Sequence, residues 1–166
     1  MTMQHTRVVL GIDPGPTTGL CLIGWYLITS DGRPTGLWAH AIQCDEGFAT
    51  TVVATIAQMF NQAVTYAIED FVVGRGSMKS RQHGAITRDL IGAIKTTIRH
   101  YSRGWNVHMQ AAGHVKPWAT DNRLKAAGDI YDITHGMRHA RDAARHALYA
   151  AVKHCGLPDP LSSKGG

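Results

Sequence analysis

The sequence predicts an α/β fold, a five-stranded mixed sheet flanked by helices. Three observations support this prediction. The chain opens with three short apolar segments separated by turns, and segments with helical spacing then alternate with further short apolar runs. The length of 166 residues, 44% of them hydrophobic, is enough for one domain with its own core.

The first half of the chain supplies four of the predicted strands. The first three are rich in apolar and β-branched residues, are bounded by turns, and occupy residues 7–12, 20–29 and 37–43. Short turns between them predict an antiparallel meander. Residues 47–63 carry apolar side chains at helical spacing and predict a helix. Residues 64–68 form a fourth apolar strand that ends at Glu69.

The second half alternates helix and strand. A glycine- and base-rich loop, a helix, a strand and a last helix are predicted at residues 74–83, 85–101, 105–109 and 137–155. Before the last helix, a short helix capped by Thr120 or Asp121 runs to Ala127. The folded domain is predicted to span residues 1–156, with 157–166 as a flexible tail.

Basic residues are concentrated in one half of the chain. The formal net charge is +5, but residues 72–146 contain 13 basic and 5 acidic residues, whereas the remainder contains 4 basic and 7 acidic residues. A segregated positive half is typical of proteins that bind nucleic acids. The alternative is a solvated basic surface that serves solubility.

The cysteines and the apolar runs indicate a reduced setting away from membranes. Cys21, Cys44 and Cys155 lie far apart and form no CxxC pair, so neither a disulfide framework nor a zinc knuckle is expected. A cytoplasmic location is therefore expected. The first residues contain no signal-peptide core, and no apolar run approaches the length of a membrane span.

Three acidic residues lie where the predicted elements can bring them together. Asp13 follows the first strand, where Gly15 and Gly19 favour a tight turn, Glu69 ends the fourth strand, and Asp142 lies in the last helix. Hard cations such as Mg²⁺ prefer carboxylate oxygens and retain several waters. Two such ions about 4 Å apart can activate a water and stabilise the leaving oxygen in phosphodiester cleavage.

Each carboxylate also has a purely structural interpretation. Asp13 can simply start a turn, and Glu69 can be a solvated strand end. Asp142 can form an ion pair with Arg138 or Arg145 along the helix. Taken singly, none of the three indicates a nuclease.

Together, the segments around these carboxylates resemble the RuvC family of Holliday junction resolvases. GIDPGPTTG (residues 11–19) is similar to the family's opening strand and turn, and AIEDF (67–71) is similar to its second acidic motif. HARDAARHAL (139–148) is similar to its helical motif, which has two metal-binding positions three residues apart. The resemblance extends over residues 7–155 and implies a ribonuclease H-like fold.

The resemblance implies that Asp13, Glu69 and Asp142 are catalytic metal ligands, with His139 in the place of a further aspartate. His146, four residues beyond Asp142, is the alternative histidine. Two Mg²⁺ ions are the implied cofactors. Mn²⁺ is an alternative, because a histidine in place of aspartate favours a metal that accepts nitrogen more readily.

The resemblance also implies DNA contacts. The segment after Glu69 is expected to enter the junction, and Phe71 is expected to open bases, with ordinary core packing as the alternative. Lys116 lies near a family lysine that contacts DNA at the active site. Residues 117–136 depart from the family pattern, but basic residues there can contact phosphates. The expected DNA-binding residues are Phe71, Arg75, Lys79, Arg81, Lys116, Arg123 and Lys125.

The resemblance implies the function of a crossover junction endodeoxyribonuclease in DNA recombination and repair, which hydrolyses phosphodiesters and leaves 5′-phosphates. The resemblance also implies a homodimer, because family members act as two-fold dimers, which suits a four-way junction. The candidate dimer surface consists of apolar residues of the second predicted helix, Ile86, Leu90, Ile91 and Ile94. The alternative is that these residues all belong to the core.

Three other functions stay open. They are a flap- or fork-selective nuclease of the same fold, a non-catalytic junction-binding module, and an actin-like ATP-binding fragment. The last needs a second domain, for which 166 residues leave no room.

Overall fold

The computed structural model describes residues 5–27, 34–60, 64–71, 78–102, 104–127 and 129–162. The strands are β1 (His5–Asp13), β2 (Thr17–Leu27), β3 (Pro34–Asp45), β4 (Val64–Asp70) and β5 (Val107–Ala111). The helices are α1 (Glu46–Phe60), α2 (Met78–Tyr101), α3 (Ala112–Trp118), α4 (Asp121–Ala127), α5 (Asp129–Ile133) and α6 (Arg138–Lys153).

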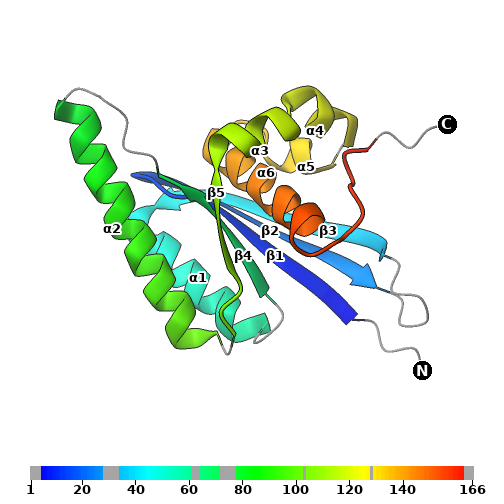
Figure 1. The fold of residues 1–166 in the computed structure, drawn as a ribbon, viewed down its shortest axis with the longest axis horizontal. Coiled ribbons are helices and arrows are strands. Elements are labelled where there is room, and N and C mark those ends of the chain that lie inside the picture. Colours follow the sequence, from blue (N-terminus) through cyan, green and yellow to red (C-terminus); the bar gives the residue numbers. More distant parts are fainter. Residues whose placement is uncertain are drawn as a thin grey trace.

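The five strands form one mixed sheet in the order β3-β2-β1-β4-β5 (Figure 1). β1, β2 and β3 are the predicted antiparallel meander, whereas β1, β4 and β5 run parallel. Ile12 of β1 pairs with Ile68 of β4, so the next residues, Asp13 and Glu69, lie at neighbouring strand ends. The predicted α/β fold with a five-stranded mixed sheet is confirmed.

The sheet has an apolar core on each face, because successive strand residues point to opposite sides. On one face Val8, Leu10 and Ile12 of β1 pack with α1 and α2. On the other face Val9 packs with α6 and with the short helices before it. Figure 1 shows the two groups of helices on opposite sides of the sheet.

Three helical segments differ from the sequence prediction. Residues 78–83, expected to be loop, form the first turns of α2. They carry no apolar side chains at helical spacing beyond Met78, so periodicity did not indicate a helix there. The short helices α3 and α5 were not predicted; α3 contains Pro117, which usually marks the end of a helix.

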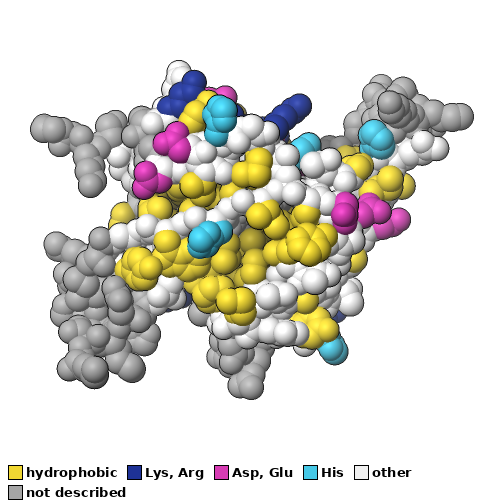
Figure 2. Space-filling model, turned by 180° about the vertical axis from the view of Figure 1, so that it is seen from behind, with side chains coloured by type: hydrophobic (Ala, Val, Ile, Leu, Met, Phe, Trp, Pro, Cys, Tyr) yellow, Lys and Arg dark blue, Asp and Glu magenta, His cyan; other side chains and the backbone are white. Residues whose placement is uncertain are grey.

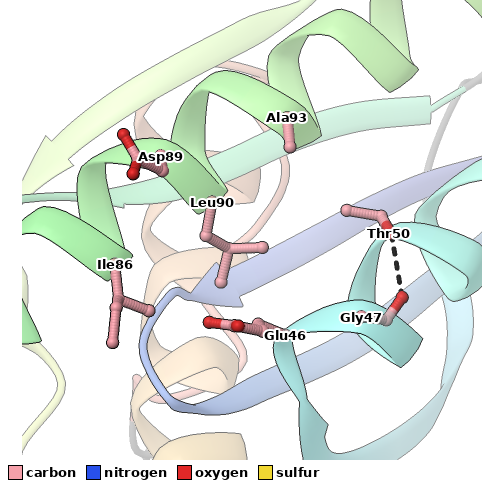
Figure 3. Close-up of a pocket in the computed structure, with 7 residues that line it drawn as sticks. All are labelled: Glu46, Gly47, Thr50, Ile86, Asp89, Leu90 and Ala93. Atoms are coloured by element: carbon pink, nitrogen blue, oxygen red, sulfur yellow. Dashed lines mark hydrogen bonds between the residues drawn. The ribbon is translucent and has the colours of Figure 1, made fainter.

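The apolar residues of α2 belong mainly to the core. Leu90, Ile91 and Ile94 are buried against α1 and the sheet, which favours the core interpretation over a dimer surface. Ile86 is partly buried and lines a groove between α1 and α2 opposite Glu46, as Figure 3 shows. Only this rim of the predicted apolar face is open at the surface.

The segment after α6 packs on the domain as far as Ser162. Leu157 and Leu161 are buried in the core beside α6. Asp159 accepts from Arg123 of α4 at 2.7 Å. These contacts hold residues 157–162 in place, and residues 163–166 lie outside the described part of the chain.

One face of the molecule carries a cluster of apolar side chains (Figure 2). Trp38 of β3 stacks on Phe60 of α1, with ring centroids 6.1 Å apart, and Met59 beside them is exposed. The indole of Trp38 occupies the space above Gly24, where a Cβ would collide with it.

Within the described ranges, no helix is long and apolar enough to cross a membrane. The three cysteines are free thiols.

Candidate active site

The sheet and α6 bring the three predicted carboxylates to one end of the molecule. Asp13 ends β1, Glu69 lies at the end of β4 next to it, and Asp142 comes from α6, which crosses β1, β2 and β4. Thr18 donates its hydroxyl to the carbonyl of Gly15 at 2.7 Å and closes the turn after Asp13. All three carboxylates are at least partly buried.

Two glycines let α6 lie directly on the strand backbone. A Cβ at Gly11 would overlap the backbone carbonyl of Ala143, and one at Gly19 would overlap the carbonyl of His139. Gly19 therefore serves the close approach of α6. The sequence analysis assigned it, with Gly15, to a tight turn, but neither has a positive φ.

The first turn of α6 is capped from the sheet. Its N-cap residue Met137 provides no side-chain hydrogen bond. Instead, the side-chain oxygen of Gln43 in β3 accepts from the backbone N–H of His139 at 2.6 Å and of Ala140 at 3.4 Å. Because Gln43 pairs with Gly19 across β2 and β3, the cap and the close approach fix the same turn of the helix.

Asp13 is bonded to His139. Nδ1 of His139 lies 2.7 Å from Oδ2 of Asp13, and the imidazole is 40% exposed. Burial raises the pKa of Asp13 to about 6, and the negative charges of Glu69 and Asp142 add to this effect against the opposing contact with His139. Burial and the neighbouring carboxylates thus disfavour the charged form of Asp13.

Glu69 is held by a buried histidine. Nε2 of His146 lies 2.9 Å from Oε2 of Glu69, and Nδ1 lies 2.8 Å from the side-chain oxygen of Gln110, the partner of Glu69 across β4 and β5. An ionised carboxylate oxygen only accepts, so Nε2–H of His146 donates to Glu69; a neutral imidazole then accepts at Nδ1, for which the amide nitrogen of Gln110, buried and without a partner in the described residues, is the matching donor. Burial acts to raise the pKa of Glu69, but the hydrogen bond from His146 and the charge of Lys116 hold it below its ordinary value.

Asp142 lies between two basic side chains. Nζ of Lys116 is 3.0 Å from Oδ2 of Asp142 and 3.7 Å from Glu69. Arg145 pairs with the other oxygen of Asp142 and with Asp121, and its Nε donates to the carbonyl of Ala119 at 2.8 Å. Burial acts to lower the pKa of Lys116, but its contacts with Asp142 and Glu69 raise it above the ordinary value.

The structure therefore brings together Asp13, Glu69, His139, Asp142 and Lys116. Each carboxylate is bonded to a histidine, lysine or arginine, and within the described ranges no three acidic, histidine or cysteine side chains surround a single point as metal ligands do. The donor chemistry nevertheless fits Mg²⁺ or Mn²⁺, because it consists of carboxylate oxygens and one accessible imidazole.

The two histidines of α6 occupy different environments. His139 is partly exposed at the mouth of the site, whereas His146 is fully buried and has a partner at each ring nitrogen. This arrangement favours His139 over His146 as the histidine available to a ligand.

Of the remaining predicted DNA-binding residues, the three whose side chains are described make contacts away from the carboxylates. Phe71 packs against the core and covers Gly84 of α2, which is the structural alternative for this residue. Arg123 stacks over Trp118 and pairs with Asp159, and Lys125 lies 5.2 Å from the ring of Tyr131. Arg75 and the side chains of Lys79 and Arg81 lie outside the described part of the structure.

Three residues of the site were missed by the sequence analysis as site residues, namely Gln43, Gln110 and Arg145. The two glutamines lie on strands, distant in sequence from the residues that they hold, and no local pattern marks them. The i,i+3 spacing did predict the pair between Arg145 and Asp142 as an alternative, but not the contacts of Arg145 with Asp121 and Ala119.

Comparison with known proteins identifies the fold. No protein-family model matches this sequence. No curated protein matches it either. Among solved structures, the chain is similar to T. thermophilus RuvC in complex with a Holliday junction substrate, with a TM-score of 0.60 and 19% sequence identity. The match covers 90% of this chain and 96% of that one. The chain therefore has a RuvC-like, ribonuclease H-type α/β fold.

Proposed function

We propose that this protein is a divalent-metal-dependent endonuclease that cuts branched DNA at four-way junctions. The observation that carries the proposal is the convergence of Asp13, Glu69 and Asp142 from β1, β4 and α6, with Lys116 beside two of them. The likeness in fold to RuvC, which was solved with a Holliday junction substrate, supports the same substrate class.

Asp13, Glu69 and Asp142 would hold the metal ions, with His139 as a further ligand or as the group that positions water. The metal would supply Lewis-acid activation of the attacking water and charge stabilisation at the leaving oxygen. Because basic side chains contact all three carboxylates, metal binding would compete with these contacts.

The surrounding residues orient the carboxylates. His146 holds Oε2 of Glu69, and His139 contacts Oδ2 of Asp13, so neither histidine occupies the second oxygen of its carboxylate. Lys116 carries a positive charge next to two of the carboxylates. Its ammonium group would contact the phosphate that is cut when Glu69 and Asp142 hold the metal.

The test is cleavage of a labelled four-way junction, a flap and a linear duplex by the wild type and Asp13→Asn, with Mg²⁺ or with Mn²⁺. We expect paired, symmetric nicks in the junction that disappear in Asp13→Asn, because the variant loses a charged metal ligand. Asp70→Asn, which changes an exposed carboxylate on the same strand end as Glu69, is the matched control and should cut normally.

Other outcomes would redirect the proposal. If the protein cuts mainly flaps, the proposed metal-dependent cleavage stands, but the substrate is a flap and not a four-way junction. Tight junction binding by the wild type without cleavage in either metal would reject nuclease activity and leave a binding module.

A further inference from the structure

A basic pocket adjoins the carboxylate cluster and shares Lys116 and Asp142 with it. It has a volume of about 460 Å³ and lies between α6 and the segment containing α3 and the start of α4. Its lining consists of four basic and two acidic side chains, Lys116, Asp121, Arg138, Arg141, Asp142 and Arg145. The formal charge of this set is +2, so the pocket attracts anions even after its internal ion pairs are counted.

The four basic side chains are not equally engaged. Arg145 contacts Asp142, Asp121 and the carbonyl of Ala119, and Lys116 contacts Asp142 and Glu69, so these two cations are already neutralised. The remaining positive charge therefore belongs to the two arginines in the first turn of α6.

Arg138 and Arg141 have free donor capacity. Arg138 is exposed, and its side chain forms no ion pair or hydrogen bond with other residues in the described ranges. Arg141 lies with Cζ 4.3 Å from the centre of the Tyr131 ring and makes one long hydrogen bond, of 3.4 Å, to the carbonyl of Thr134. Its Nε is buried and donates to no acceptor in the part of the chain that the structure describes.

We propose that this pocket binds a backbone phosphate of the DNA strand, adjacent to the phosphate that is cut. Arg138 and Arg141 are three residues apart and therefore share a helix face, and a guanidinium matches a phosphate with two parallel hydrogen bonds. The pocket shares Lys116 and Asp142 with the carboxylate cluster, so a strand that reaches the carboxylates passes it. This inference rests on the proposed function, because it assumes a DNA substrate.

The salt dependence of binding tests the proposal. Affinity of the full chain for a four-way junction is measured by fluorescence anisotropy in EDTA over a series of KCl concentrations, for the wild type, Arg138→Gln and Arg141→Gln. The logarithm of the association constant falls as the logarithm of the salt concentration rises, and each glutamine variant should make this slope shallower by about 1. Each should also weaken binding roughly tenfold at about 0.1 M salt. Arg138→Lys should retain most of the wild-type slope, because it keeps the charge.

Arg99→Gln is the matched control. Arg99 is an exposed helical arginine near the end of α2, and α2 runs from the end of β4 to the start of the parallel strand β5. Arg99 therefore lies at the opposite end of the sheet from the carboxylates, and its substitution should leave the slope unchanged. Thermal unfolding of all variants verifies that they are folded.

The outcomes separate this inference from the proposed function. The phosphate pocket would be overturned if both glutamine variants kept the wild-type salt dependence, or if Arg99→Gln reduced it as much as they do. Either result would hold even if the wild type cuts junctions. Reduced slopes in a protein that cuts nothing would support the pocket and reject the nuclease. If inorganic phosphate at constant ionic strength stabilises the wild type but not the variants, while junction slopes stay unchanged, the pocket binds free anions and the DNA assignment is wrong.

Discussion

Asp13 is buried and lies near two other carboxylates, so its negative charge lowers the free energy of unfolding by a measurable amount. Because its pKa is raised from 3.8 to about 6 in the folded protein, ionisation is less favourable there than in the unfolded chain. Asp13 therefore destabilises the metal-free protein as pH rises from about 4 through 6, by up to about 3 kcal/mol.

We expect Asp13→Asn to be more stable than the wild type at pH 8 in EDTA, by up to about 3 kcal/mol, and nearly equal to it at pH 4. Urea unfolding at both pH values measures this difference. Asp70→Asn is the control for a carboxylate in solvent. If the gain in stability were the same at pH 4 and pH 8, it would not come from removing the negative charge of Asp13.

His146 is expected to contribute to stability as well as to the site. It is fully buried and bonded to both Glu69 and Gln110, so His146→Ala leaves a cavity and two polar groups without a partner. We expect a loss of about 3 kcal/mol in the free energy of unfolding, measured by urea titration. A loss below about 0.5 kcal/mol, the range of ordinary surface substitutions, would show that these contacts do not hold the fold.

His139 offers a test of metal preference. An imidazole beside the carboxylates favours Mn²⁺ over Mg²⁺, because Mn²⁺ accepts nitrogen more readily. We expect His139→Asp to raise the ratio of Mg²⁺-supported to Mn²⁺-supported cleavage by roughly tenfold. His135→Asp, at an exposed position, should leave the ratio unchanged. Equal rates with both metals in the wild type, and no change in His139→Asp, would reject this idea.

Single residues were predictable where the chemistry is local. Asp13 and Glu69 could be placed together because strand ends and side-chain type are visible in the sequence. Gln43 and Gln110 could not, because their partners are set by sheet register and by the position of α6, which are long-range properties.

Several contacts join helix α6 to the α3–α4 segment, and those of Arg145 are among them. Arg145 reaches from α6 to Asp121 and Ala119 and also holds Asp142, which is almost fully buried. Arg145→Leu should lower the free energy of unfolding by about 3 kcal/mol, because it removes one partner of a buried ion pair. Arg123→Leu, which breaks the more exposed pair with Asp159, should cost about 1 kcal/mol.

Urea unfolding of the two variants checks this ranking. Equal losses would mean that Arg145 does not join the helices more strongly than an ordinary surface pair. If Arg145→Leu is folded but no longer binds divalent cations, measured by calorimetry, the arginine also positions Asp142.

Helices with a clear hydrophobic period were predicted from the sequence, and the short helix α4 was predicted from its capping residue, but α3 and α5 were missed. α1 and α6 each present an apolar face to the sheet, which makes their spacing recognisable. α3 and α5 have 7 and 5 residues, fewer than two full turns, so they are too short to show a hydrophobic period. Tertiary contacts stabilise them, through the buried residues Val115 and Ile130.

At the scale of the whole molecule, the expected homodimer stays a prediction. Leu90, Ile91 and Ile94 are used within the chain, so a dimer contact requires other residues. We expect a dimer by light scattering at concentrations that cut junctions, with both nicks made in one binding event, because two active sites must face opposite strands. A monomer well above those concentrations would argue against paired incision.

The close approach of α6 to the sheet has a consequence for genetics. A mutational scan scored only by survival or activity would place Gly11 and Gly19 among the most sensitive positions, beside the acidic residues, although neither carries a functional group. Even alanine would push the helix away from β1 and β2 and take His139 and Asp142 with it. The sensitive positions in such a scan would therefore include residues that α6 contacts as well as residues that take part in the chemistry.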